Sequence, residues 1–413
     1  MRTPLDSPFS PGSDSVPVVW AGRTAQLSDW RDVLRPRRLA GIPERGRTVL
    51  GEAGSGKSAL VRRIAAEASD VGDWVSPQLR IPTGTDPLRR VASALLDLAG
   101  TAGLAAAREK RIAGLLGRVE SVAASGLSLS LRSSKEPEAY MALTELLVEV
   151  GRAALGAGVM VVLHLDEVQN LDDRHALSQV LIALGDALTY EQRVEAPGAV
   201  RFERALPIAV FLTGLPEFTD MAGARTGATF ARRFQTVTLG AIDDASMLTA
   251  LQPFVSEGWE VAGDEPSGDE PGRVFMEPGA QRAIVERACG EPFLFQLAGE
   301  RAWYAGEGDV ITAREAARGW QGAAGEAEAH VQRILERLPQ REQEVLEAMA
   351  GLDPQDRMLT RIAREAGFAR ATDAGPAAQR LDITRGIIRR GKPYTFRHRA
   401  VEAYLTSDWP RLG

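Results

Sequence analysis

One motif constrains the fold of this chain most: Gly51-Glu52-Ala53-Gly54-Ser55-Gly56-Lys57-Ser58. It matches G-x-x-x-x-G-K-[ST], a loop whose backbone amides surround phosphate groups, and it lies between the apolar run Thr48–Leu50 and a helical pattern. Glycines let the backbone wrap around the anion, and the following helix directs its positive N-terminus toward it. The motif therefore predicts a nucleoside triphosphate site, in which Lys57 contacts the β- and γ-phosphates and Ser58 binds Mg²⁺.

A second motif places two carboxylates, Asp166 and Glu167, after the apolar run Val159–Leu165. Such a run is typical of a buried parallel strand, and ligands bind at the carboxyl edge of a parallel sheet. By itself the pair is equally explained as a solvated turn. Its occurrence downstream of the phosphate loop favours a catalytic interpretation, in which Asp166 holds Mg²⁺ and Glu167 polarises the attacking water.

The size and composition of the chain bound its class. With 413 residues it is too long for one domain, and its single cysteine, Cys289, suits a reducing compartment and a buried, apolar position. No signal-like N-terminus and no membrane-length apolar stretch occur, so a cytoplasmic, soluble protein is expected. The four histidines lack metal-ligand spacing, which leaves the Mg²⁺ of the nucleotide as the only expected metal.

The net charge of −6 argues against an evenly basic coat for nucleic acid, yet the C-terminal region carries a basic cluster. We define this basic cluster as Arg385, Arg389, Arg390, Lys392, Arg397 and Arg399. It is a candidate contact for the phosphate backbone of double-stranded DNA. A solvated basic face, or contacts to acidic residues of the same chain, is the alternative.

Strand and helix patterns divide the chain into modules. Residues 1–17 are rich in Pro, Ser and Asp and are expected to be disordered. From 18 to 242 strands alternate with helices, which predicts an α/β domain with a parallel sheet and helices on both faces. Within it a helix is expected at Thr24–Leu34, a strand at Trp74–Ile81, and a helix capped by Asp86 that runs toward Leu98. An insertion is expected at about 101–135, where a helix at 105–119 precedes the alternating segment Leu127–Leu131.

The remaining sequence is mainly helical. A helical domain is expected at 243–325, interrupted by a mobile loop at Gly263–Gly272. The last helix of this domain is expected at Thr312–Gly322. A third module at 326–413 contains four helical segments, then a strand-turn-strand pattern at Ile387–Phe396 and a last helix. The four segments are Val331–Arg337, Gln340–Met349, Met358–Ala366 and Pro376–Ile383.

In this order, these elements resemble an AAA+ ATPase. The resemblance is closest to the branch of origin-recognition initiators, signalling STAND ATPases and Tn7-type transposition regulators, and it extends over nearly the whole chain from about Val18. It implies a P-loop NTPase sheet, a helical lid at 243–325 and an α+β winged-helix domain at 326–413, whose wing is Arg389–Phe396. It also implies ATP and Mg²⁺ as cofactors.

The resemblance assigns roles to further residues. Gly22 and Arg23 resemble the element that lies near the adenine, and Thr213 resembles the polar residue that senses the γ-phosphate. Arg232 and Arg233 stand where such ATPases carry an arginine finger, which acts on the nucleotide of a neighbouring subunit and so implies a homo-oligomer. For Thr213 a strand-terminal, backbone-satisfying role is the alternative, and for the arginines a helix-capping pair. The nucleotide-binding set is Gly51, Glu52, Ala53, Gly54, Ser55, Gly56, Lys57, Ser58, Ala59, Gly22, Arg23 and Pro292.

The lid departs from the standard AAA+ pattern. Gly290-Glu291-Pro292 resembles the Gly-x-Pro element of STAND proteins and replaces the phosphate-reading arginine of other lids. Pro292 is then expected against the base or ribose of the nucleotide. A slow, regulated ATPase switch fits this lid better than a vigorous motor.

Two functions compete. The first is an Mg²⁺-dependent ATPase switch that oligomerises with ATP and engages DNA through its winged helix. The second is a STAND-like signalling or defence ATPase whose winged helix holds a closed state or docks a protein partner. The sequence shows neither a sensor repeat nor an effector domain, which favours the first, and the lid and third module argue against a metabolic kinase.

Overall fold

The computed structural model describes residues 2–13, 15–82, 84–103, 139–171, 174–195, 201–219, 230–261 and 272–411, with Lys110, Gly114 and Gly117. The predicted helix at 105–119, the strand at 127–131 and nearly all of the loop at 263–272 lie outside these residues. The chain divides into two compact units. We call residues 24–50 and 60–238 the sheet unit, and residues 1–23, 51–59 and 239–413 the lid unit.

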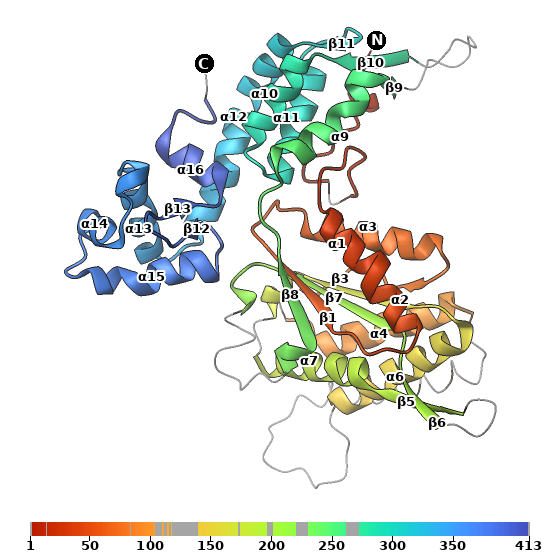
Figure 1. Ribbon diagram of the computed structural model, residues 1–413. Helices are drawn as coiled ribbons and strands as arrows, with labels where there is room; N and C mark the ends of the chain where they lie inside the picture. The colour runs from red at the N-terminus through yellow and green to blue at the C-terminus, as the bar shows by residue number, and fades with distance from the viewer. Residues whose placement is uncertain are drawn as a thin grey trace. The chain divides into compact units, whose positions relative to one another are not determined.

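A parallel sheet in the order β2-β4-β7-β1-β8 forms the centre of the sheet unit, and β3 extends it beside β4 (Figure 1). Every residue of β1, β4 and β7 is buried, because helices cover both faces. The predicted α/β fold is thus confirmed. The strands are β1 (Gly46–Leu50), β2 (Trp74–Val75), β3 (Leu79–Arg80), β4 (Val161–Asp166), β7 (Ile208–Gly214) and β8 (Phe234–Thr238).

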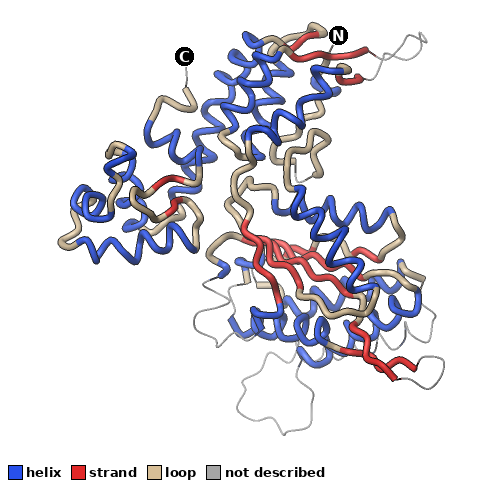
Figure 2. Tube along the Cα trace, viewed as in Figure 1, coloured by secondary structure: helices blue, strands red, loops and turns tan. Residues whose placement is uncertain are grey.

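Helices α4, α6 and α7 pack against one another on one side of this sheet, and α1 to α3 lie on the other (Figures 1 and 2). Asp86 caps α4 as predicted, accepting hydrogen bonds from two backbone amides. The hairpin of β5 (Glu191–Glu195) and β6 (Arg201–Ala205) was not anticipated. The helices are α1 (Thr24–Ser28), a π-helical segment (Asp29–Leu34), α2 (Arg35–Leu39), α3 (Lys57–Asp70), α4 (Pro87–Thr101), α6 (Ala139–Ala157) and α7 (Arg174–Thr189).

One predicted strand and one predicted helix differ from the structure. The strand expected at Trp74–Ile81 is split into β2 and β3, because Pro77 has no backbone N–H to give to a ladder. The helix expected at Thr24–Leu34 continues to Leu39.

Helices make up most of the lid unit, as the sequence predicted for residues after 242. A three-stranded sheet in the order β11-β10-β9 accompanies them and was not anticipated. The first part of this region comprises α9 (Asp244–Ser256), β9 (Trp259–Val261), β10 (Gly272–Met276), α10 (Pro278–Ala288), α11 (Pro292–Tyr304), β11 (Val310–Ile311) and α12 (Ala313–Glu336).

Helix α12 runs straight through the expected boundary at 325/326, where the sequence suggested two separate helices. Thr312 and Glu315 form a capping box at its start. Its buried residues Trp320, Ala327 and Ile334 recur on one face, so a continuous apolar stripe holds both halves against the same core. The expected division between a lid and a third module is therefore bridged by one helix.

The C-terminal module follows this helix with the elements the sequence predicted. Helix α15 begins before its expected start at Pro376, and a short hairpin follows it, with Ile388 paired to Phe396. Its elements are α13 (Gln340–Ala350), α14 (Leu359–Glu365), α15 (Ala371–Ile383), β12 (Ile388–Arg389), β13 (Thr395–Phe396) and α16 (Arg399–Thr406).

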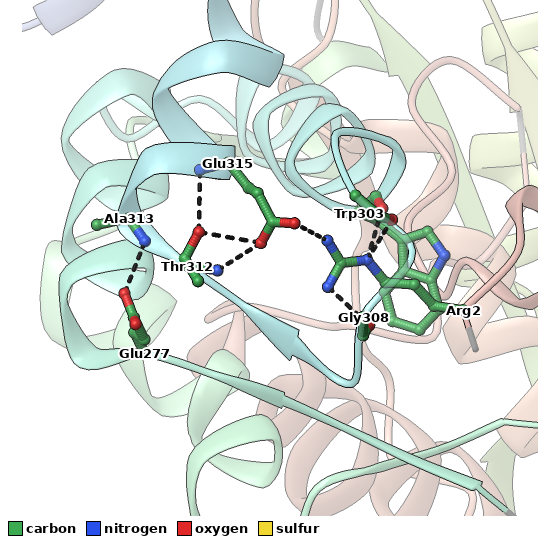
Figure 3. Close-up of polar contacts among 8 residues, drawn as sticks. Arg2, Glu277, Trp303, Gly308, Thr312, Ala313 and Glu315 are labelled. Atoms are coloured by element: carbon green, nitrogen blue, oxygen red, sulfur yellow. Dashed lines mark hydrogen bonds and ion pairs between the residues drawn. The ribbon is translucent and has the colours of Figure 1, made fainter.

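The N-terminal segment contradicts the expectation of a disordered tail at residues 1–17. The Arg2 guanidinium donates to the carbonyl oxygens of Trp303, Gly306 and Gly308 and pairs with Glu315 at 2.9 Å (Figure 3). Phe9 is 3% exposed. The prediction was wrong because it used the average composition of the segment. Two side chains, Arg2 and Phe9, pack into the lid and order the segment.

Candidate nucleotide site

The phosphate loop lies in the lid unit and follows β1 directly along the chain. Lys57 Nζ donates to the carbonyl oxygens of Gly51 and Glu52, at 2.9 Å each, so its side chain folds back over the loop. Gly54 and Gly56 have φ angles of +80° and +82°, a conformation that disfavours any side chain. A Cβ on Gly54 would also lie 2.6 Å from the ring of His330. The loop thus depends on glycine for both its conformation and its packing.

A pocket of about 390 Å³, which includes space open to solvent, lies beside this loop. The loop contributes Ser55, Gly56 and Ala59 to its wall, and the lid contributes Pro292. An apolar wall with a few polar groups is typical of a small-molecule site. The remaining lining residues are Pro17, Val19, Trp20, Ala21, Arg23, Ile242, Phe295 and Gln296.

Gly22 and Arg23 both adopt the left-handed conformation, with φ of 61° and 62°. This turn directs the Arg23 guanidinium toward the phosphate loop, where it donates to the carbonyl oxygen of Ser55 at 3.0 Å. Burial lowers the pKa of Arg23. The structure therefore brings together three predicted parts of the nucleotide site: the Gly22-Arg23 element, the phosphate loop and Pro292.

Gln296 fixes the wall of this pocket from α11. Its amide nitrogen donates to the carbonyl oxygen of Val19 at 2.8 Å, and its amide oxygen accepts from the backbone of Ser10 at 3.2 Å. One buried side chain thus joins two points of the N-terminal segment to the lid. This role of Gln296 was not predicted from the sequence.

Helix α12 also contacts the phosphate loop. Arg337, the residue that caps its C-terminal end, forms an ion pair with Glu52, and His330 stacks on Phe293 with 4.7 Å between ring centroids. The backbone amide of Phe293 donates to the carbonyl oxygen of Gly54 at 3.2 Å. Burial and nearby positive charge lower the pKa of His330 to about 4, so this imidazole is neutral at neutral pH.

The C-terminal module meets the lid near the Gly-x-Pro element. His398 caps α16, and its Nε2 lies 3.5 Å from Glu291, the residue before Pro292. Both side chains are buried. His330, Arg337 and His398 were not predicted as site residues, because they are far from the loop in sequence. The only available signal was the spacing of His330 and Arg337, about two helical turns apart on one face.

The carboxyl edge of the sheet holds the predicted residues of the sheet unit. Because β4 and β7 are parallel neighbours, Asp166 and Thr213 lie at the same edge. The buried Thr213 hydroxyl donates to Asp166 and lies 2.9 Å from His164 Nε2. Gln78 also donates to Asp166, and Arg80 approaches it at 3.8 Å. Sequence reasoning missed His164, Gln78 and Arg80.

Glu167 differs from Asp166 in being exposed and in adopting a left-handed conformation, with φ of 56°. This conformation turns the chain sharply after β4 and is uncommon for a residue other than glycine or asparagine. Glu167 Oε2 accepts from the Asn170 side chain at 3.2 Å. The buried first carboxylate and exposed second carboxylate suit the separate roles predicted for them.

Arg232 and Arg233 end a 3-10 turn, Phe230–Arg233, directly before β8. Arg232 is exposed. Arg233 forms an ion pair with Asp186 on α7, so its guanidinium is held within its own chain. An action of either arginine on a neighbouring subunit stays a prediction.

Most of the basic cluster is paired with acids of the same chain. Arg385 contacts Glu342 at 3.3 Å, Arg390 and Arg397 contact Asp382 at 3.1 Å and 2.7 Å, and Arg399 pairs with Asp244. Arg389 and Lys392 are exposed and have no ion-pair partner among the described residues. The structure therefore supports the intramolecular alternative for four of the six cations.

Other expectations concern absences and Cys289. Within the described ranges, no helix is long and apolar enough to cross a membrane, and no cluster of His, Cys, Asp and Glu forms a metal site. Cys289 is buried, as predicted, and burial raises the pKa of its thiol to about 12.

The phosphate loop, the parallel sheet and the helical region after it define a P-loop ATPase fold of the AAA+ type. Residues 19–195 match the family model described as an AAA ATPase domain. This match covers fewer than half of the 413 residues of the chain. No curated protein matches the chain.

Two solved structures show the same fold over almost the full length. One is a Walker-type ATPase of Pyrococcus abyssi, with 16% identity, a TM-score of 0.53 and coverage of 94% of this chain and 96% of that chain. The other is the ORC2 protein of Aeropyrum pernix in ADPNP–ADP complexes, with 14% identity, a TM-score of 0.53 and coverage of 97% and 95%. At these low sequence identities the comparison establishes similarity of fold alone.

Proposed function

We propose that this protein is an Mg²⁺-dependent ATP-binding and ATP-hydrolysing switch that assembles into oligomers in the ATP state and engages double-stranded DNA. One observation carries the proposal: Arg23, the phosphate loop and Pro292 line a single pocket. This pocket suits the base and ribose, and the adjoining loop amides suit the phosphates. Turnover is slow, because Pro292 occupies the lid position at which other AAA+ enzymes carry an arginine.

The chemistry follows from the donor groups. A hydroxyl and a carboxylate, from Ser58 and Asp166, fit Mg²⁺, which prefers oxygen ligands and keeps water and phosphate oxygens as its other partners. The Thr213 and Gln78 hydrogen bonds hold Asp166 in one orientation for this role. Lys57 binds the phosphates, Glu167 polarises the attacking water, and Thr213 senses the γ-phosphate.

The oligomer and DNA parts of the proposal rest on fewer residues. Arg233, or Arg232 beside it, completes the site of a neighbouring subunit, which requires Arg233 to leave Asp186. Arg389 and Lys392, the two exposed cations of the hairpin, contact the DNA phosphates.

A second candidate function is supported by other contacts. Arg399 pairs with Asp244, and His398 approaches Glu291, so α16 is tied to the lid by two polar links. Such links favour a STAND-like switch, in which the C-terminal module holds a closed state or docks a protein. Both candidates share the ATPase centre and differ in the partner.

The deciding experiment is an ATPase assay on the full chain at increasing protein concentration, with and without double-stranded DNA. We expect specific activity to rise with concentration and to rise further with DNA. Activity that ignores DNA but depends on concentration supports the second function. The Lys57→Ala variant is the negative control, and ATP binding by this variant equal to that of the wild type would contradict the nucleotide site.

A further inference from the structure

We propose that Arg337 is a positioning residue for nucleotide binding: by neutralising Glu52 inside the phosphate loop, it makes the loop acceptable to a triphosphate and links nucleotide binding to the end of α12. The inference rests on the proposed function and deepens it. It concerns a charge within the loop that the motif itself does not require, because its second position accepts any residue.

Glu52 is an unusual residue for its surroundings. It is 6% exposed, and it belongs to the loop that must receive an anion. A buried carboxylate without a cationic partner is strongly unfavourable, and a negatively charged ligand nearby increases that cost. A loop that keeps Glu52 ionised therefore needs a positive partner to bind ATP.

Arg337 is the partner that α12 supplies. Its guanidinium pairs with Glu52, and its Nε is buried. Lys57 Nζ donates to the backbone oxygens of Gly51 and Glu52, and the lowered pKa of His330 leaves that ring neutral at neutral pH. Arg337 thus brings a positive charge to Glu52 from the far end of the chain.

The position of Arg337 couples phosphate binding to the end of α12. The residue caps α12, and α13 of the C-terminal module begins at Gln340. Any motion that withdraws the end of α12 removes the cation from Glu52 and weakens phosphate binding. By linkage, phosphate binding must stabilise the docked end of α12 to the same degree.

The test is a titration of the full-length protein with ATP and with ADP. We expect Arg337→Ala to weaken ATP binding about 10- to 100-fold, within the range typical of coupled sites, and to weaken ADP binding less, since repulsion grows with ligand charge. Arg337→Lys retains most of the affinity. Arg333→Ala, which removes an exposed arginine from the same helix, is the matched control and leaves binding unchanged.

The second variant isolates the charge of Glu52. Adding Glu52→Gln to Arg337→Ala removes the buried negative charge, so we expect the double variant to recover ATP affinity to within about threefold of wild type. Unchanged ATP binding in Arg337→Ala overturns the proposal. So does an equal loss for ATP and ADP without rescue, which is the result of a purely structural role or of direct phosphate contact.

The outcomes also separate this inference from the proposed function. If wild type does not bind ATP, or binds it as the Lys57→Ala variant does, the nucleotide site itself is wrong. If wild type binds, Lys57→Ala does not and Arg337→Ala matches wild type, only the role of Arg337 is wrong. Thermal unfolding of each variant identifies any that fails to fold, and the double variant then decides.

Discussion

The sheet unit and the lid unit hold their site residues in different ways. In the sheet unit, Asp166 and Thr213 lie together because two neighbouring parallel strands end at one edge. In the lid unit, the phosphate loop is surrounded by Arg23, Pro292, His330 and Arg337, which come from three distant stretches of chain. The first arrangement follows from strand topology and local motifs, whereas the second depends on tertiary packing. Substitutions in the two units should therefore differ in their effects on activity, binding and stability.

The largest effect is expected for a substitution at the carboxyl edge of the sheet, Glu167→Gln. Glu167→Gln removes a carboxylate that is exposed, so the fold is expected to survive while water activation is lost. We expect phosphate release to fall roughly 10²- to 10⁴-fold, the range for a lost general base, with ATP affinity retained. A phosphate-release assay beside a nucleotide titration measures both, and unchanged turnover would remove Glu167 from catalysis.

The next prediction tests the lid unit through its N-terminal segment. The Phe9 ring stacks on Phe254 at 5.7 Å, and Gly299 leaves the space into which the ring packs. Phe9→Ala should lower the free energy of unfolding by about 3–5 kcal/mol. Leu5→Ala is the control in the same segment, since Leu5 is 97% exposed. Equal free energies of unfolding for the two variants, measured by urea unfolding, would contradict the packing of residues 1–17 on the lid.

A third prediction uses the buried imidazole of α12. The pKa of His330 is lowered from 6.5 to about 4, so between these values the unfolded chain binds a proton that the folded chain does not. The free energy of unfolding therefore decreases as pH falls through this window, by up to about 3 kcal/mol from this group. His330→Gln should remove that part of the slope, as urea unfolding at pH 7, 5.5 and 4.5 would reveal. Identical slopes in both proteins would contradict the assignment.

The smallest effect concerns the basic cluster. Arg389→Ala with Lys392→Ala removes the two exposed cations, so we expect DNA affinity to fall severalfold. The slope of log affinity against log salt concentration should become less steep by about two, because about two phosphate contacts are lost. Arg390→Ala, whose guanidinium pairs with Asp382, is the matched control and should change binding less. Affinity unchanged in the double variant would move the DNA site away from the hairpin and favour the protein-docking function.

Sequence reasoning succeeded where a local pattern reflects a local cause. Buried apolar runs predicted β4 and β7, and capping residues such as Asp86 marked the start of helices. It failed where the cause was distant. Arg2 and Phe9 lie in a polar stretch whose composition predicts disorder. In the folded chain, however, Arg2 donates to the carbonyl oxygen of Trp303 and Phe9 stacks on Phe254. The same holds for the basic cluster, whose partners Glu342, Asp382 and Asp244 lie outside it.

The sequence by itself specified the two motifs on which the proposed chemistry rests. The phosphate loop and the Asp166-Glu167 pair need specific residue types at fixed spacing, because bond lengths and backbone conformation set their geometry over a few residues. Only the tertiary structure decided what surrounds the loop. The pairing of Glu52 with Arg337 and the stacking of His330 on Phe293 join residues that the chain brings together after its cores have packed, and no local pattern encodes such contacts.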